Sequence, residues 1–73
     1  MAQLKHDDYD VLERALAKGS RILVQRRGRQ EYVIVPLALR TRDGRELIEA
    51  RNPITGHSLT IHLDEIDAIQ AMP

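Results

Sequence analysis

Arginine side chains that could bind phosphate are concentrated in the middle of this chain. Arg26, Arg27 and Arg29 lie within one short polar segment, and Arg42 and Arg45 flank a second one. An arginine can donate two parallel hydrogen bonds to one phosphate, so such a cluster can follow a nucleic-acid backbone. These five arginines are therefore candidate nucleic-acid-binding residues, and the alternative is a basic face that contacts only solvent.

The chain has only two aromatic residues, Tyr9 and Tyr32. Proteins that bind single-stranded nucleic acid usually stack bases on several aromatic side chains. The composition therefore argues against sequence-specific reading of RNA.

A second charged group is acidic and lies near the start of the chain: Asp7, Asp8, Asp10 and Glu13. It coincides with the predicted beginning of a helix, where carboxylates can accept free backbone N–H groups and balance the helix dipole. The functional alternative is that these carboxylates imitate phosphate charge and dock on a basic groove of a partner protein.

Two further groups of residues contain side chains that could bind a metal or act as a nucleophile. His57, His62 and Asp64 lack a fourth ligand and do not follow a zinc spacing. Ser58 has no residue placed to orient a neighbouring base, which a nucleophilic serine requires. We therefore expect no catalytic residue, no metal site and no cofactor, and we predict that the protein is not an enzyme.

Apolar residues at helical spacing predict one helix over about residues 8–18. Asp7 or Asp8 is suited to cap its start, and Gly19 is suited to end it. The apolar positions form one face that must be buried, and they are Tyr9, Val11, Leu12, Ala15 and Leu16.

Alternating β-branched residues and turn signals predict five to six short strands after the helix. Gly28 marks a first hairpin turn, and Asp43-Gly44 is the strongest signal for a two-residue hairpin. Pro36 marks a bend, a bulge or an edge between two strands, 31–35 and 37–42. Later strands are predicted at 45–51 and at 58–63. After a tight turn at 64–66, Ile66 and Ile69 belong to a last short strand or an extended tail.

Length and pattern together predict a single domain over residues 1–73. The fold class is mainly β with one N-terminal helix, as a small SH3-like or Sm-like β-barrel over about residues 20–71. The net charge of zero hides a segregation, since residues 14–51 carry a net +6 and each flanking segment a net −3. No apolar run reaches membrane-spanning length and no cysteine is present, so we expect a soluble cytoplasmic protein.

Residues 15–69 resemble the WYL domain, an Sm-like barrel of bacterial transcription regulators. Val35-Pro36-Leu37-Ala38-Leu39 is similar to the family's Pro-Leu-x-Leu element, and residues 59–66 are similar to its closing stretch. The Trp-Tyr-Leu positions hold Glu46, Leu47 and Ile48, and the closing arginines are replaced by His62 and Glu65. The resemblance implies the barrel and a role in transcription regulation, but the family's ligand site is not carried over.

The start of the chain also resembles Rof, a small protein that binds the transcription termination factor Rho and blocks its RNA site. The similar segment is Asp7-Asp8-Tyr9-Asp10-Val11-Leu12-Glu13-Arg14-Ala15, and Leu63-Asp64-Glu65-Ile66 is similar to Rof's closing turn. This resemblance implies a helix on an Sm-like barrel that acts in antitermination through its acidic helix.

Three functional hypotheses follow. The first is a WYL-like regulatory module that binds nucleic acid or a protein of the transcription machinery. The second is a Rof-like inhibitor of Rho whose candidate contact residues are Asp7, Asp8, Asp10 and Glu13. The third is a homo-oligomer that buries a strand edge.

Overall fold

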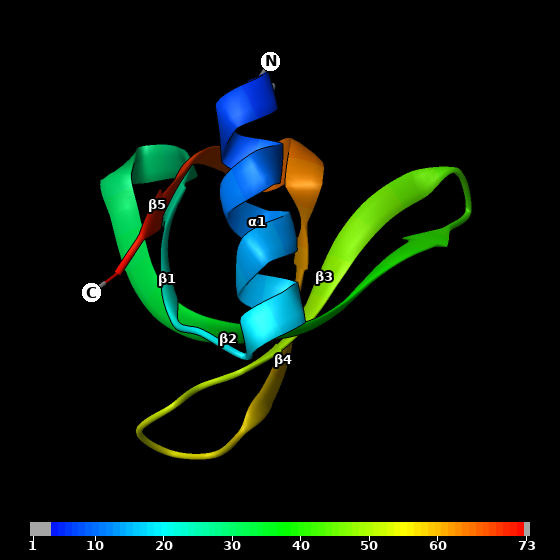
Figure 1. Ribbon diagram of the computed structural model, residues 1–73. Helices are drawn as coiled ribbons and strands as arrows, with labels where there is room; N and C mark the ends of the chain where they lie inside the picture. Colours follow the sequence, from blue (N-terminus) through cyan, green and yellow to red (C-terminus); the bar gives the residue numbers. More distant parts are fainter. Residues whose placement is uncertain (1–3, 73) are drawn as a thin grey trace.

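Helix α1, His6–Lys18, buries one side against a curved sheet (Figure 1). The structure is a computed structural model that describes residues 4–72, apart from the side chain of Arg29. Leu12 is fully buried and Ala15 nearly so, as the apolar spacing predicts. Gly19 ends the helix with a φ of +67°, a left-handed conformation that costs glycine little because it has no Cβ.

The helix begins at His6, two residues before the start predicted from the sequence. Lys5 is the residue before the helix, and Asp8 lies inside the first turn rather than ahead of it. The Asp8 carboxylate accepts a hydrogen bond from the Lys5 backbone N–H at 3.0 Å. A carboxylate inside the first turn can thus accept a hydrogen bond from the backbone N–H of the residue before the helix. Asp8 stabilises the helix start in this way although it does not precede the helix.

Five antiparallel strands form one sheet in the order β4-β3-β2-β1-β5. The strands are β1 (Ile22–Arg26), β2 (Gln30–Arg42), β3 (Arg45–Arg51), β4 (Ser58–His62) and β5 (Ile66–Ala71). The first four follow one another as neighbours, and the last returns to pair with β1. The prediction of a mainly β fold with one N-terminal helix is confirmed.

Strand β2 is one long bent strand, so the prediction of two separate strands around Pro36 is wrong. Its first part pairs with β1 up to Ile34, and its second part pairs with β3 from Val35 onward. The register with β3 shifts between Pro36 and Ala38, which is the bulge that the proline predicts. This bend lets one strand serve both halves of the sheet and curls the sheet around the helix (Figure 1).

The turns follow the predicted chemistry. Asp43 and Gly44 have φ values of +54° and +76°, as a two-residue hairpin between β2 and β3 requires. Between β3 and β4, the side chain of Asn52 accepts hydrogen bonds from the backbone N–H groups of Ile54 and Thr55. The turn after β4 is one turn of 3₁₀ helix, η2 (Leu63–Glu65), which leads directly into β5.

The core lies between α1 and the concave side of the sheet. It contains buried side chains from the helix, from every strand and from η2: Leu12, Ala15, Ile22, Val24, Ile34, Ile48, Ala50, Ile61, Leu63, Ile66 and Ile69. Strands β4 and β5 are the two edge strands of the sheet. They follow each other in the chain, and the short turn η2 connects them. This arrangement is consistent with the predicted small barrel. Within residues 4–72, no helix is long and apolar enough to cross a membrane.

Candidate functional site

Arg26, one of the candidate phosphate ligands, is engaged by the protein itself. It ends β1, immediately before the 3₁₀ turn η1 (Arg27–Arg29). Its guanidinium lies 3.2 Å from a carboxylate oxygen of Glu65 in η2 and 5.6 Å from the centre of the Tyr32 ring. The ion pair and the cation–π contact hold the side chain against the sheet, which leaves less of its charge available to a ligand.

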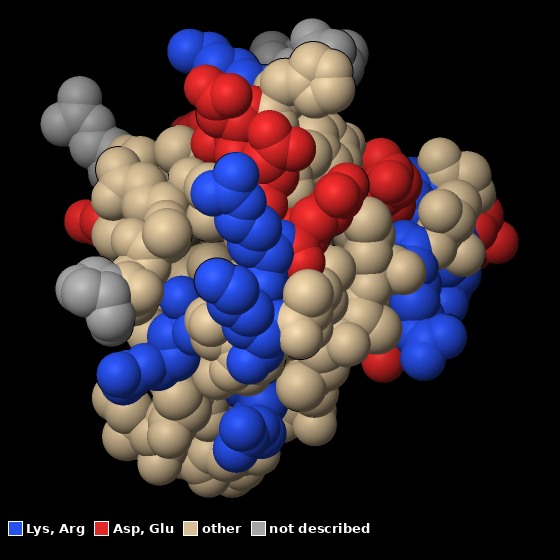
Figure 2. Space-filling view, viewed as in Figure 1, with Lys and Arg blue, Asp and Glu red and all other residues tan. Residues whose placement is uncertain are grey.

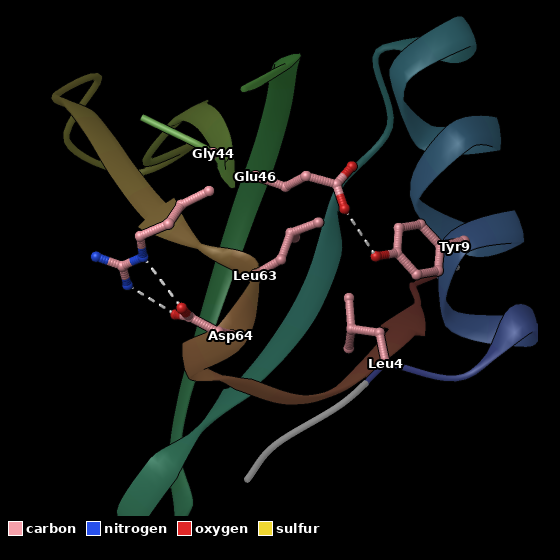
Figure 3. A pocket seen from close by; sticks show the side chains of 7 residues that line it. Leu4, Tyr9, Gly44, Glu46, Leu63 and Asp64 are labelled. Atoms are coloured by element: carbon pink, nitrogen blue, oxygen red, sulfur yellow. Dashed lines mark hydrogen bonds and ion pairs between the residues drawn. The ribbon is translucent and has the colours of Figure 1, made fainter. Parts of the chain in front are cut away.

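Arg45, at the start of β3, also forms an ion pair within the chain. Its Nε and Nη2 atoms donate hydrogen bonds of 3.1 and 2.9 Å to the two carboxylate oxygens of Asp64 (Figure 3). This two-point contact lowers the pKa of Asp64 below its ordinary value, with smaller contributions from His62 and Arg27. The geometry is that of the strongest class of exposed ion pair.

The Arg45–Asp64 pair predicts that stability falls at acid pH. The pKa of Asp64 in the folded state lies below its ordinary value of 3.8. The ionised Asp64 carboxylate therefore stabilises the folded state fully when the pH is above that ordinary value. This stabilisation is lost as the pH falls through the lower folded-state pKa. Urea unfolding followed by circular dichroism should show that Asp64→Asn weakens this acid-side decline. Asp67→Asn, which alters an exposed β5 carboxylate, should leave it unchanged; equal slopes in the two variants would contradict the assignment.

Arg27 and Arg42 form no ion pair with a described residue. Arg27 lies exposed in η1, and Arg42 lies exposed at the end of β2, opposite Arg45 across the hairpin. The side chain of Arg29 lies outside the described part of the structure. The five arginines therefore do not form one free basic face, since two of them are already paired with η2 carboxylates.

The acidic residues of α1 fall into two structural classes. Asp8 is half-buried and accepts hydrogen bonds from the backbone N–H groups of Lys5 and Ile69, at 3.0 and 3.3 Å. Its carboxylate joins the start of the helix to β5. Asp7, Asp10 and Glu13 are exposed, and none forms an ion pair with a described residue.

We call Asp7, Asp10 and Glu13 the acidic stripe. They recur every three residues, so they follow one side of the helix away from the core. Figure 2 shows carboxylates gathered over the upper part of α1, where the helix begins. The exposed carboxylates thus form a row of negative charge that begins at the positive end of the helix dipole with Asp7 and extends to the middle of the helix with Glu13.

A hollow of about 260 Å³ lies beside the first turns of the helix. Tyr9 reaches across it from α1 and donates a hydrogen bond of 3.1 Å from its hydroxyl to Glu46 on β3 (Figure 3). Leu4 and Leu63 form apolar walls, and Asp64 lies at the edge. Arg45 also lines the hollow, and its charge is paired with Asp64. The two leucines and Glu46 leave a mixed surface that suits a long basic side chain, whose stem is apolar and whose end is charged.

Burial raises the pKa of the Tyr9 hydroxyl above its ordinary value of 10.0, and Glu46 raises it further. Tyr9 therefore stays protonated at neutral pH and acts as a hydrogen-bond donor in the hollow. Sequence reasoning placed Tyr9 on the apolar face of the helix and missed its contact with Glu46, 37 residues away. The residue type could have indicated such a contact, because the hydroxyl of a partly buried tyrosine usually forms a hydrogen bond with a polar group.

The histidines do not assemble a metal site. His57 is exposed in the turn before β4, and His62 lies 3.9 Å from Glu65. Among the described residues, no group of three or more histidine, aspartate or glutamate side chains could hold a metal ion.

Comparison with protein-family models finds no matching family, and no curated protein matches the chain. The acidic stripe and the adjacent hollow therefore provide the basis for a functional proposal.

Proposed function

We propose that this chain is a non-enzymatic regulatory module that binds a partner protein through the acidic stripe of α1. The observation that carries the proposal is the contrast between two charged sets. Asp7, Asp10 and Glu13 are exposed without a described ion-pair partner, whereas Arg26 and Arg45 are paired with carboxylates of the same chain. Along the N-terminal half of α1, from Asp7 to Glu13, the exposed side-chain charge that is free to meet another molecule is negative.

A row of carboxylates along a helix is suited to a basic surface that otherwise binds nucleic acid. Neighbouring members of the stripe are about 5–6 Å apart at Cβ, so several cationic side chains can be engaged at once. The hollow beside Tyr9 can receive one of them, with its stem against Leu4 and Leu63. Binding of this kind would cover the partner's nucleic-acid site.

The resemblance of residues 7–15 to the acidic helix of Rof makes the termination factor Rho the partner to test. In that proposal the module covers the RNA site of Rho and favours transcription through termination sites. Direct binding of nucleic acid by the arginines is the second proposal. Exposed Arg27 and Arg42 support it, and the ion pairs of Arg26 and Arg45 weaken it.

The test is displacement of a fluorescent single-stranded RNA from purified Rho, measured by anisotropy. The wild-type chain should displace the RNA, and the effect should weaken with added salt because the contacts are electrostatic. The variant Asp7→Asn/Asp10→Asn/Glu13→Gln should bind at least about tenfold more weakly, since it loses three charges that steer and hold the complex.

The matched control is Glu31→Gln/Asp43→Asn/Asp67→Asn, which removes the same charge from exposed carboxylates elsewhere. It should displace RNA as the wild type does. Equal weakening in both triple variants, or no displacement by the wild type, would overturn the proposal. Binding of the labelled RNA by the chain alone would instead support the arginine proposal.

A further inference from the structure

The charge on the exposed side of α1 reverses along the helix. Arg14 and Lys18 are four residues apart on one side of the C-terminal half, and Arg21 lies three residues beyond the last helical residue. Figure 2 shows basic side chains over the lower part of α1, below the carboxylates. We call these three residues the basic cluster.

The basic cluster surrounds a second hollow, of about 240 Å³, where the end of α1 meets β1 and the end of β5. Val11, Ile22 and Ala71 contribute apolar walls, and Ser20 also lines the hollow. The Ser20 backbone N–H donates to the Ala15 carbonyl at 3.1 Å, so the turn that carries the hydroxyl is held in place by the helix.

The cations of this hollow have no described carboxylate partner. Arg26, Arg40 and Arg45 each pair with an acidic side chain, whereas Arg14, Lys18 and Arg21 pair with none among residues 4–72. Among residues 4–72, no acidic side chain lines the hollow. Three like charges around one concavity repel one another, and a bound anion would relieve that repulsion.

We propose that this hollow binds a small phosphate monoester. The phosphate would lie among Arg14, Lys18 and Arg21, with Ser20 as an additional donor, and the carbon skeleton of the ester would cover the apolar walls. A monoester carries about −1.5 to −2 charge near neutral pH and offers three oxygens, which matches several cationic donors better than a single carboxylate does.

The surroundings favour a small ligand over a nucleic-acid chain. A nucleic-acid backbone needs a continuous row of basic side chains. Here the acidic stripe occupies the N-terminal half of the same helix and interrupts such a row. In the described part of the chain, no aromatic side chain lines the hollow on which a base could stack. The site is independent of the proposed partner surface, because it uses none of the same residues.

The test is an NMR titration of the ¹⁵N-labelled chain at low salt with methyl phosphate, a monoester, and dimethyl phosphate, a diester with one negative charge. Methyl phosphate should cause saturable shifts confined to amides near the C-terminal end of α1 and residues 20–22. Dimethyl phosphate should bind at least about tenfold more weakly, because it makes fewer charge-assisted hydrogen bonds. Butyl phosphate should bind more tightly than methyl phosphate if its chain covers the apolar walls.

Lys18→Gln should weaken methyl phosphate binding about tenfold, the loss expected for one charge-assisted contact. Lys5→Gln makes the same substitution at the opposite end of the helix and should leave the affinity unchanged; circular dichroism verifies that both variants fold. The proposal is overturned by equal affinity for the two methyl esters, by equal weakening in the two variants, by the absence of saturable shifts, or by tighter binding of a short oligonucleotide without a terminal phosphate.

Discussion

Replacement of Leu12 by alanine should lower the free energy of unfolding by about 2–5 kcal/mol. Leu12 is fully buried and belongs to the cluster that joins α1 to the strands. Its loss leaves a cavity on the side of the helix that the sheet encloses. A chain of 73 residues has a total stability of about 4–11 kcal/mol, so this change removes a large share of it. Urea unfolding followed by circular dichroism measures the difference.

Ile54→Ala is the matched control for this experiment. Ile54 is 90% exposed in the turn between β3 and β4, so the substitution removes a similar aliphatic side chain without opening a cavity. Its effect should stay within about 0.5 kcal/mol. If Leu12→Ala is as mild as Ile54→Ala, the packing of α1 against the sheet described here is incorrect.

Much of the fold could be predicted because local chemistry decides it. Gly19 and Gly44 lie where the backbone needs a positive φ, and both positions could be identified from their neighbours. Pro36 predicts an interruption of the hydrogen bonds between strands, because proline has no backbone N–H to donate. Whether that interruption ends the strand or becomes a bulge depends on β3. Strand β3 pairs with β2 from Val35, opposite Arg51, to Arg42, opposite Arg45, and so continues the strand beyond the proline. That information is not local, and the prediction of two strands was wrong for this reason.

The candidate site was harder to predict because its partners are distant in the sequence. Arg26 and Glu65 are 39 residues apart, and Arg45 and Asp64 are 19 apart. These pairs form because η1 and η2 lie at the same end of the β1–β5 pairing and because β3 packs against η2. Counting arginines in a segment measures the local charge, but it cannot show which of these charges the fold neutralises.

Asp8 illustrates the same difficulty within the acidic helix. In the sequence it is one of four equivalent carboxylates, and the resemblance to Rof covers it together with Asp7 and Asp10. In the structure one of its carboxylate oxygens accepts from the Lys5 N–H and the other from the Ile69 N–H. Both contacts are made within the chain, so Asp8 belongs to the fold. A variant that removed Asp7, Asp8 and Asp10 together would therefore confuse lost binding with lost stability.

We expect Asp8→Ala to lower the free energy of unfolding by about 2 kcal/mol, because two backbone donors lose their acceptor and the Ile69 N–H is partly buried. Asp7→Ala, one position earlier and exposed, should change stability by less than about 0.5 kcal/mol. Urea unfolding distinguishes the two variants, and amide hydrogen exchange at Ile69 should accelerate only in Asp8→Ala. Equal stability of the two variants would mean that Asp8 does not join the helix to β5, and it would return Asp8 to the set of carboxylates available to a partner.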